Sequence, residues 1–115
     1  MIGENTEKAI IRAVNEEQQH CIDKHGEFHN HHEAWAVLCE ETQEVVECLV
    51  PFNKISAANM DELWKLIRED SMYEDGAVEL VEQIYNIAME LAKETIQVLA
   101  MCKKWRTLID KERAM

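Results

Sequence analysis

The chain has 115 residues, and 47% of them are hydrophobic, which is enough apolar material for one compact domain with a buried core. The formal net charge of −11 argues against nonspecific binding to nucleic acid polymers or to an anionic membrane, because phosphate groups repel it. A nucleotide ligand is not excluded, since a cation such as Mg²⁺ can lie between acidic side chains and a phosphate.

The composition favours long helices, with only three Gly and one Pro. The first helix is predicted from about Asn5 to Lys24, and Gly26 ends it. A second helix starts near Asn30, where Asn30 and Glu33 have the spacing of a capping box. This helix is expected to stop before Pro51, because proline disfavours helical continuation.

Residues 51–58 are predicted to be a linker, and a third helix is expected to begin at Asn59. Gly76 marks the next break, and a long last helix is predicted from Ala77 to about Lys111. The expected fold is therefore an all-α, four-helix bundle formed by residues 1–115 as a single domain. The last helix is apolar on so many sides that a second subunit is expected to cover it.

The four cysteines show no C-x-x-C spacing, no signal peptide opens the chain, and no apolar run approaches the roughly 20 residues that span a bilayer. These features predict reduced, mostly buried thiols in a cytoplasmic protein that does not enter a membrane.

Acidic residues of the second helix do not all face water when they are placed at about 100° per residue. Glu40 falls opposite the apolar stripe, whereas Glu41 falls inside it and Glu44 lies on its edge. An ionised carboxylate in apolar surroundings is costly unless a basic group, a proton or a metal compensates it. Because Glu41 and Glu44 are neighbours at i and i+3, a divalent cation would turn their repulsion into attraction.

On the last helix, Glu94 lies closest to the apolar border of a narrow polar stripe, and Gln97 follows on the same side. Their oxygen atoms suit Mg²⁺ or Mn²⁺. The competing interpretation is that both stripes are the solvent faces of amphipathic helices.

The segment Glu40 to Glu44 reads E-E-T-Q-E, and the segment Glu94 to Gln97 reads E-T-I-Q. This pair resembles the E-E-x-x-E and E-x-x-D motifs of the MazG-like all-α nucleoside triphosphate pyrophosphohydrolases. Three further stretches, HGEFHNHHEAWAVLCEETQEV, DELW and AKETIQVLAMCKKW, are similar to a compact phage and bacterial branch of that family. The resemblance covers nearly the whole chain.

The resemblance implies hydrolysis of an NTP or dNTP to the nucleoside monophosphate and pyrophosphate, in a homodimer or homotetramer. It implies that Mg²⁺, with Mn²⁺ as the alternative, is held by Glu41, Glu44, Glu94 and Gln97. Glu40 would act in the outer shell or position water, and Glu41 or Glu44 would take the proton of the water. Basic residues near the second motif, Lys93 and Lys104 among them, are expected to contact phosphate oxygens.

Two departures from the family pattern favour an alternative. Gln97 replaces the usual Asp and carries no charge, and the gap of 50 positions between Glu44 and Glu94 exceeds the usual one. The alternative is a catalytically weakened or inactive MazG-like helical oligomer that binds nucleotide or a protein partner.

Four histidines, His25, His29, His31 and His32, gather around the first loop. They present ligands for zinc, although no Cys pair accompanies them. A second hypothesis is that this loop borders the nucleotide pocket, where a His or Phe28 would touch the base. An ordinary surface loop is the third interpretation.

Overall fold

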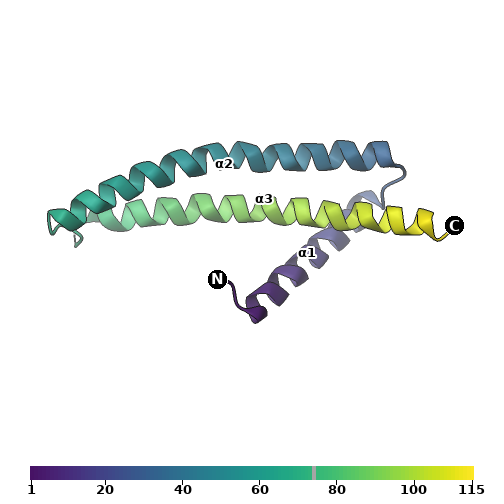
Figure 1. The fold of residues 1–115 in the computed structure, drawn as a ribbon, viewed down its shortest axis with the longest axis horizontal. Coiled ribbons are helices and arrows are strands. Elements are labelled where there is room, and N and C mark those ends of the chain that lie inside the picture. Colours follow the sequence, from purple (N-terminus) through teal and green to yellow (C-terminus); the bar gives the residue numbers. More distant parts are fainter. Residues whose placement is uncertain (74) are drawn as a thin grey trace. The chain divides into compact units, whose positions relative to one another are not determined.

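The computed structural model describes residues 1–73 and 75–115, with the side chain of residue 75 excepted. Three helices and no strand form this described part of the chain: α1 is Glu4–His25, α2 is His31–Arg68 and α3 is Asp75–Arg113 (Figure 1). The all-α class and the long C-terminal helix are confirmed, since α3 has 39 residues. The predicted helix count of four is wrong for the described residues, because the second and third predicted helices are one.

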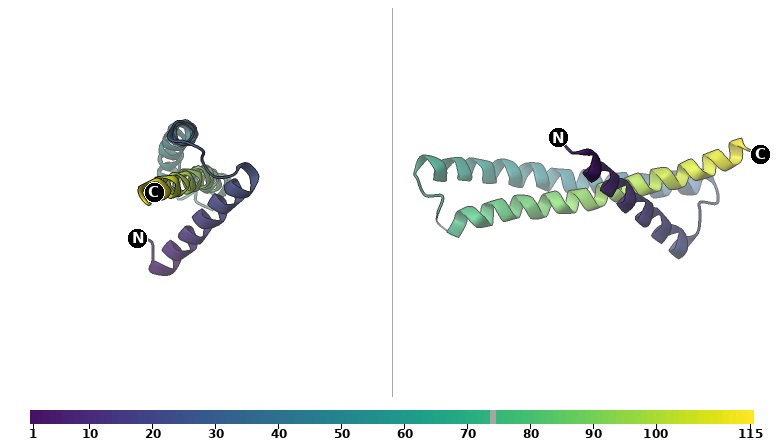
Figure 2. Two further views of the ribbon diagram at one scale, coloured as in Figure 1. Left: turned by 90° about the vertical axis from the view of Figure 1, so that its right-hand side faces the viewer. Right: turned by 90° about the horizontal axis from the view of Figure 1, so that it is seen from below.

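The first helix and the loop after it follow the predicted local signals. Gly26 has a φ of +76°, and its backbone N–H donates to the carbonyl of Ile22 at 2.7 Å, which ends α1. The side-chain oxygen of Asn30 accepts a hydrogen bond from the backbone N–H of Glu33 at 2.8 Å, which caps α2. Helix α1 runs obliquely across the last part of α3, which belongs to the same compact unit (Figure 2).

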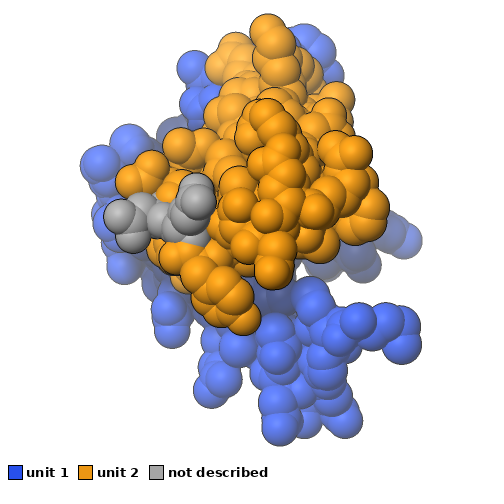
Figure 3. Space-filling view, turned by 90° about the vertical axis from the view of Figure 1, so that its left-hand side faces the viewer, with its two compact units in different colours: residues 1–44, 94–115 blue, residues 45–93 orange. Residues whose placement is uncertain are grey.

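The chain divides into two compact units (Figure 3). Unit 1 comprises residues 1–44 and 94–115, and thus α1, the first part of α2 and the last part of α3. Unit 2 comprises residues 45–93, in which the rest of α2 pairs with the first part of α3.

The core of unit 1 joins all three helices and the loop between α1 and α2. Its buried members are Val14, Phe28, Ala34, Ala100 and Met101. Ala34 of α2 and Ala100 of α3 are completely buried, and their small side chains fill little space between the helices.

Helix α2 continues through Pro51, where the sequence predicts a linker over residues 51–58. A proline inside a helix removes one backbone hydrogen bond and costs about 3 kcal/mol. Tertiary packing offsets this cost, because a stripe of mostly apolar residues at i+3 and i+4 spacing continues without a change of register on both sides of the proline. Its partly or fully buried members are Val45, Cys48, Phe52, Ile55, Asn59, Leu63 and Leu66. Packing of this stripe in unit 2 therefore overrides the local preference for a break.

Asn59 is a buried member of that stripe and not the start of a helix, as the sequence predicts. Its amide donates to the carbonyl of Leu80 at 3.1 Å and to the side-chain oxygen of Gln83 at 2.9 Å, both on α3. A buried amide with two acceptors is satisfied, so Asn59 ties α2 to α3 inside unit 2.

Helix α2 ends instead at Arg68, in a turn with Asp70 in the left-handed region at φ 53°. The backbone N–H of Ser71 donates to Leu66 and that of Asp70 to Ile67, which is the Schellman pattern of a helix C-terminus. Gly76, the predicted break, lies in the first turn of α3.

None of the described helices is long and apolar enough to cross a bilayer. Cys39 and Cys102 are exposed, and Cys21 and Cys48 are half-buried. The expectation that the thiols are mostly buried is therefore wrong.

Candidate metal centre

Three carboxylates predicted to be metal ligands come together in unit 1. Glu41 and Glu44 lie one turn apart on α2, and Glu94 lies on α3. One ligand atom from each of the three lies within 4.8 Å of the other two. Among the residues that the structure describes, this is the one group of three or more acidic, histidine or cysteine side chains close enough to share a cation.

The environment of Glu41 disfavours its charge. The side chain is half-buried, and its Oε2 atom is buried without a hydrogen-bond partner among the described residues. Burial raises the pKa of the Glu41 carboxyl above its ordinary value, and the charges of Glu44, Glu94 and Glu40 raise it further. A divalent cation would satisfy the orphaned oxygen and reverse the repulsion, so the donor set fits Mg²⁺ or Mn²⁺.

Three further predicted site residues, Glu40, Gln97 and Lys93, are not part of the group of three carboxylates. Glu40 is exposed on α2, where its charge acts on Glu41. Gln97 is half-buried one turn beyond Glu94 on α3. Lys93 is exposed in unit 2, and its ammonium is 3.2 Å from a carboxylate oxygen of Glu90. The roles of these three residues stay predictions.

Lys104, by contrast, is only 6% exposed and lines a cavity of about 370 Å³ in unit 1. Its ammonium lies 4.2 Å from the centroid of the Phe28 ring, in a cation–π contact. Glu41 lines the same cavity, so one carboxylate of the candidate cation site and Lys104 border the same space.

The loop before α2 borders this cavity, and the interpretation that it borders a nucleotide pocket stays a prediction. Phe28 and His29 of the loop are part of the lining, together with His25 at the end of α1. His29 is held in place by Glu33, whose carboxylate accepts from the His29 ring Nδ1 at 3.0 Å and from its backbone N–H at 3.3 Å. The hydrogen bond from the His29 ring lowers the pKa of the Glu33 carboxyl.

Sequence reasoning missed several wall residues, among them Cys21 of α1 and Met101 of α3. Burial raises the pKa of the Cys21 thiol, and Glu17 adds to the effect through a hydrogen bond and its charge. The crossing of α1 over the last part of α3 puts both residues at one cavity, and no pattern in the sequence indicates that crossing.

The structure does not support a zinc site at the histidines, since none of them belongs to a group of three ligands in the described residues. His31 is engaged at both ring nitrogens. The indole N–H of Trp105 donates to Nδ1 at 2.9 Å, and Nε2 lies 2.5 Å from a carboxylate oxygen of Glu112. These contacts orient His31 as a link between α2 and α3 in unit 1.

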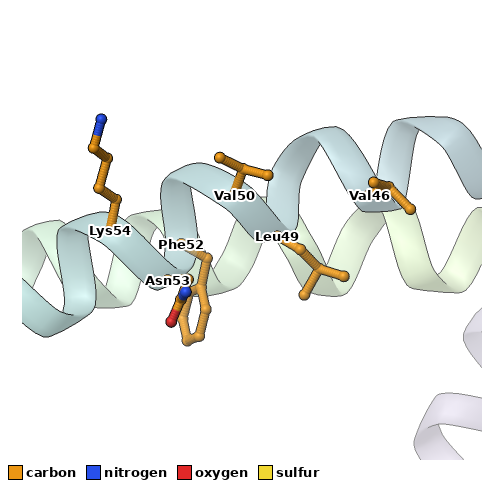
Figure 4. Close-up of a pocket in the computed structure, with 6 residues that line it drawn as sticks. All are labelled: Val46, Leu49, Val50, Phe52, Asn53 and Lys54. Atoms are coloured by element: carbon orange, nitrogen blue, oxygen red, sulfur yellow. The ribbon is translucent and has the colours of Figure 1, made fainter.

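A cavity of about 630 Å³ lies along α2 in unit 2, beside Val46, Leu49, Val50, Phe52, Asn53 and Lys54 (Figure 4). The lining is apolar apart from Asn53 and Lys54, and Lys54 points away from Phe52 (Figure 4). It offers no carboxylate for a cation, so the candidate metal centre is in unit 1.

The chain has no match among protein-family models, curated proteins or solved structures. What the centre does is therefore inferred from its own geometry and from the resemblance of its motifs.

Proposed function

We propose that the chain is a metal-dependent nucleoside triphosphate pyrophosphohydrolase that cleaves an NTP or dNTP to the monophosphate and pyrophosphate. One observation carries the proposal: Glu41, Glu44 and Glu94 converge within 4.8 Å although 50 positions separate the two segments. The orphaned Oε2 atom of Glu41 supports it, because a buried carboxylate oxygen without a partner costs about 1–3 kcal/mol. Such an arrangement is expected where a ligand completes the site.

Glu41, Glu44 and Glu94 would hold Mg²⁺ or Mn²⁺, with the amide oxygen of Gln97 as a further donor. When bound, the cation would neutralise the phosphate charge and orient the phosphoanhydride for in-line attack. The chain's own part is positioning and proton transfer. A carboxylate oxygen of Glu41 or Glu44 accepts the proton of the attacking water, and Glu40 positions that water through its neighbouring charge.

The neutral side chain of Gln97 favours the second candidate function, a weakened or inactive MazG-like oligomer that binds nucleotide or a protein partner. An amide oxygen contributes no charge to a cation site, so metal affinity falls relative to a site with Asp. This candidate shares the metal centre and differs in turnover.

We also propose that a second copy of the chain covers unit 2, in a homodimer or homotetramer. Large apolar side chains are exposed along α2 and α3 there: Val46, Leu49, Val50, Met60, Trp64, Ile67, Val78, Val81, Tyr85 and Met89. Contiguous exposed apolar residues mark interaction sites. Light scattering coupled to size-exclusion chromatography tests this proposal, and a monomer at micromolar concentration would contradict it.

The enzymatic proposal is tested by incubating the protein with a panel of NTPs and dNTPs in Mg²⁺ or Mn²⁺ and measuring pyrophosphate. Release that disappears in Glu41→Gln and persists in Glu47→Gln supports hydrolysis at this centre. Glu47 is an exposed glutamate of the same helix, so its substitution is matched in charge and chemistry. Metal binding without release from any nucleotide supports the second candidate.

A further inference from the structure

Three side chains of unit 1 join the start of α2 to the end of α3. His31 is the first residue of α2, and Trp105 and Glu112 lie on the last part of α3. The indole N–H of Trp105 donates to His31 Nδ1 at 2.9 Å. The other ring nitrogen, Nε2, lies 2.5 Å from a carboxylate oxygen of Glu112. One imidazole therefore contacts two side chains of α3, each through a different nitrogen.

The chemistry of these two partners determines which form of His31 fits between them. An indole N–H donates a hydrogen bond and accepts none, so the Nδ1 atom of His31 must carry its lone pair. A carboxylate accepts, so the proton of the ring is on Nε2. The contact with Trp105 therefore requires the neutral Nε2–H tautomer. An imidazolium has a proton on both nitrogens, and its Nδ1–H would face the indole N–H as a second donor.

The two contacts of His31 differ in how they respond to a second proton on the ring. A carboxylate accepts from a neutral and from a charged imidazole, so the Glu112 contact exists in either state. The Trp105 hydrogen bond exists only in the neutral state. Because His31 begins α2, its charged form also lies at a helix N-terminus, where the backbone N–H groups carry partial positive charge.

The other titratable groups described at this end of unit 1 lie on α2, on the loop before it and on α3. His32 of α2 lines the same hollow of about 270 Å³ as His31 and Trp105. On α3, the ammonium of Lys111 is paired with the Glu27 carboxylate of the loop. Lysine and glutamate do not ordinarily change charge in the range where histidine does. This pair therefore continues to join α3 to the loop when histidine is protonated.

We infer that His31 forms a pH-sensitive contact between α2 and α3, in which the neutral ring holds the Trp105 indole and the protonated ring releases it. Histidine ordinarily changes charge between about pH 5 and pH 8. The His31 side chain is 45% exposed, so water reaches the ring and can accept the released indole N–H. Trp105 packs against the buried core of unit 1, so protonation acts on the attachment of α2 to that core. The inference does not depend on the metal centre.

The experiment follows the indole N–H resonances in two-dimensional ¹H–¹⁵N spectra of the full chain from pH 8 to pH 5. Trp105→Phe identifies the Trp105 resonance, and Trp64 in unit 2 is the internal reference. The Trp105 resonance is expected to move upfield with the same midpoint as the His31 ring. Its exchange with water, relative to free tryptophan at the same pH, is expected to rise about 2- to 13-fold. That factor corresponds to a net hydrogen bond of about 0.5–1.5 kcal/mol.

Two histidine variants identify the group that titrates. In His31→Asn an amide oxygen lies near the position of Nδ1 and does not titrate, so the Trp105 resonance is expected to stay in place. His32→Asn removes the exposed neighbouring imidazole of the same hollow and is expected to behave as wild type. Circular dichroism at pH 8 checks that both variants fold. If His31→Asn does not fold, the titrations of wild type and His32→Asn still decide the question.

A Trp105 resonance that stays in place while the His31 ring titrates overturns the inference, as does a His31 ring that remains neutral down to pH 5. A movement of equal size in His31→Asn assigns it to another group and has the same consequence. Equal midpoints for Trp105 and His31 in wild type and in His32→Asn support the inference. These outcomes hold whether or not any nucleotide is hydrolysed, so they are distinct from the test of the proposed function.

Discussion

Glu41→Gln is expected to make the metal-free protein more stable. The substitution keeps the shape of the side chain and removes a charge that burial and three neighbouring carboxylates disfavour. Well below pH 4.5, the ordinary value for glutamate, both folded and unfolded chains hold the proton and the charge costs nothing. As the pH rises, the unfolded chain ionises first, because the folded-state pKa is raised. Stability is lost until the folded carboxyl ionises too, so the gain from Gln grows above pH 4.5.

The size of the gain follows from the geometry of the cluster. Two unit charges 4.8 Å apart repel by about 0.9 kcal/mol in water and about 3.5 kcal/mol at an effective dielectric constant of 20. Protonation sets a ceiling of about 3.4 kcal/mol at pH 7, since one pKa unit corresponds to about 1.36 kcal/mol. Glu41 is only half-buried, so solvent screens part of the repulsion. The expected gain is therefore about 1–2 kcal/mol, or roughly 4–8 °C in Tm for a chain of this size.

Thermal unfolding in EDTA at pH 7 and at pH 4 measures this gain, with Glu47→Gln as the control. Both variants change the net charge equally, and the exposed control is expected to stay within about 0.5 kcal/mol of wild type. A Glu41→Gln protein no more stable than wild type at pH 7 would refute the reasoning. A gain of the same size at pH 4 would show that ionisation is not its cause.

Mn²⁺ at about 100 times its dissociation constant is expected to stabilise wild type by about 2.7 kcal/mol and Glu44→Gln by clearly less, measured as Tm against EDTA. Equal stabilisation of both would place the cation elsewhere. Pro51→Ala is expected to raise the free energy of unfolding in urea by about 1–3 kcal/mol, because Ala restores a backbone N–H within α2; an unchanged midpoint would contradict an uninterrupted helix. The His29 hydrogen bond lowers the pKa of Glu33, so the stability that this carboxylate contributes is complete above pH 4.5 and is lost as the pH falls through the lowered value. Glu33→Gln is expected to flatten that part of the pH–stability curve, and a curve that keeps the slope of wild type would argue against the pair.

The fold could be predicted where the signals are local. Gly26 ends α1, and the Asn30 side chain caps α2, because each depends on backbone groups within a few residues. The predicted helix break at Pro51 is wrong because the prediction considered only the local cost of a proline inside a helix, about 3 kcal/mol, and no tertiary packing that offsets it. The opposing term comes from apolar side chains such as Phe52 and Ile55, each of which contributes about 1.5–3 kcal/mol when fully buried. Their spacing stays in register across the proline, and that continuity is visible in the sequence.

The candidate site was predictable to the extent that one helix determines it. The position of Glu41 inside an apolar arc follows from helical geometry alone, and its half-buried state in the structure agrees with that. That Lys104 lines the cavity did not follow from the sequence, because it depends on which stretch of α3 packs against α1 and the Phe28 loop. No periodic pattern in the sequence predicts that crossing. The sequence alone therefore does not show that Lys104 and Cys21 line the same cavity.

Lys104 and Glu41 bring two opposite charges to the same cavity. Lys104 and Glu41 line the same hollow, yet they form no ion pair with each other, since the described residues offer Lys104 no ion-pair partner and Glu41 Oε2 no hydrogen-bond partner. A chain optimised for stability would bring the two together or replace both with apolar residues. Holding them apart therefore costs stability in the empty cavity, and the stability of the metal-free Glu41→Gln and Lys104→Met variants measures that cost.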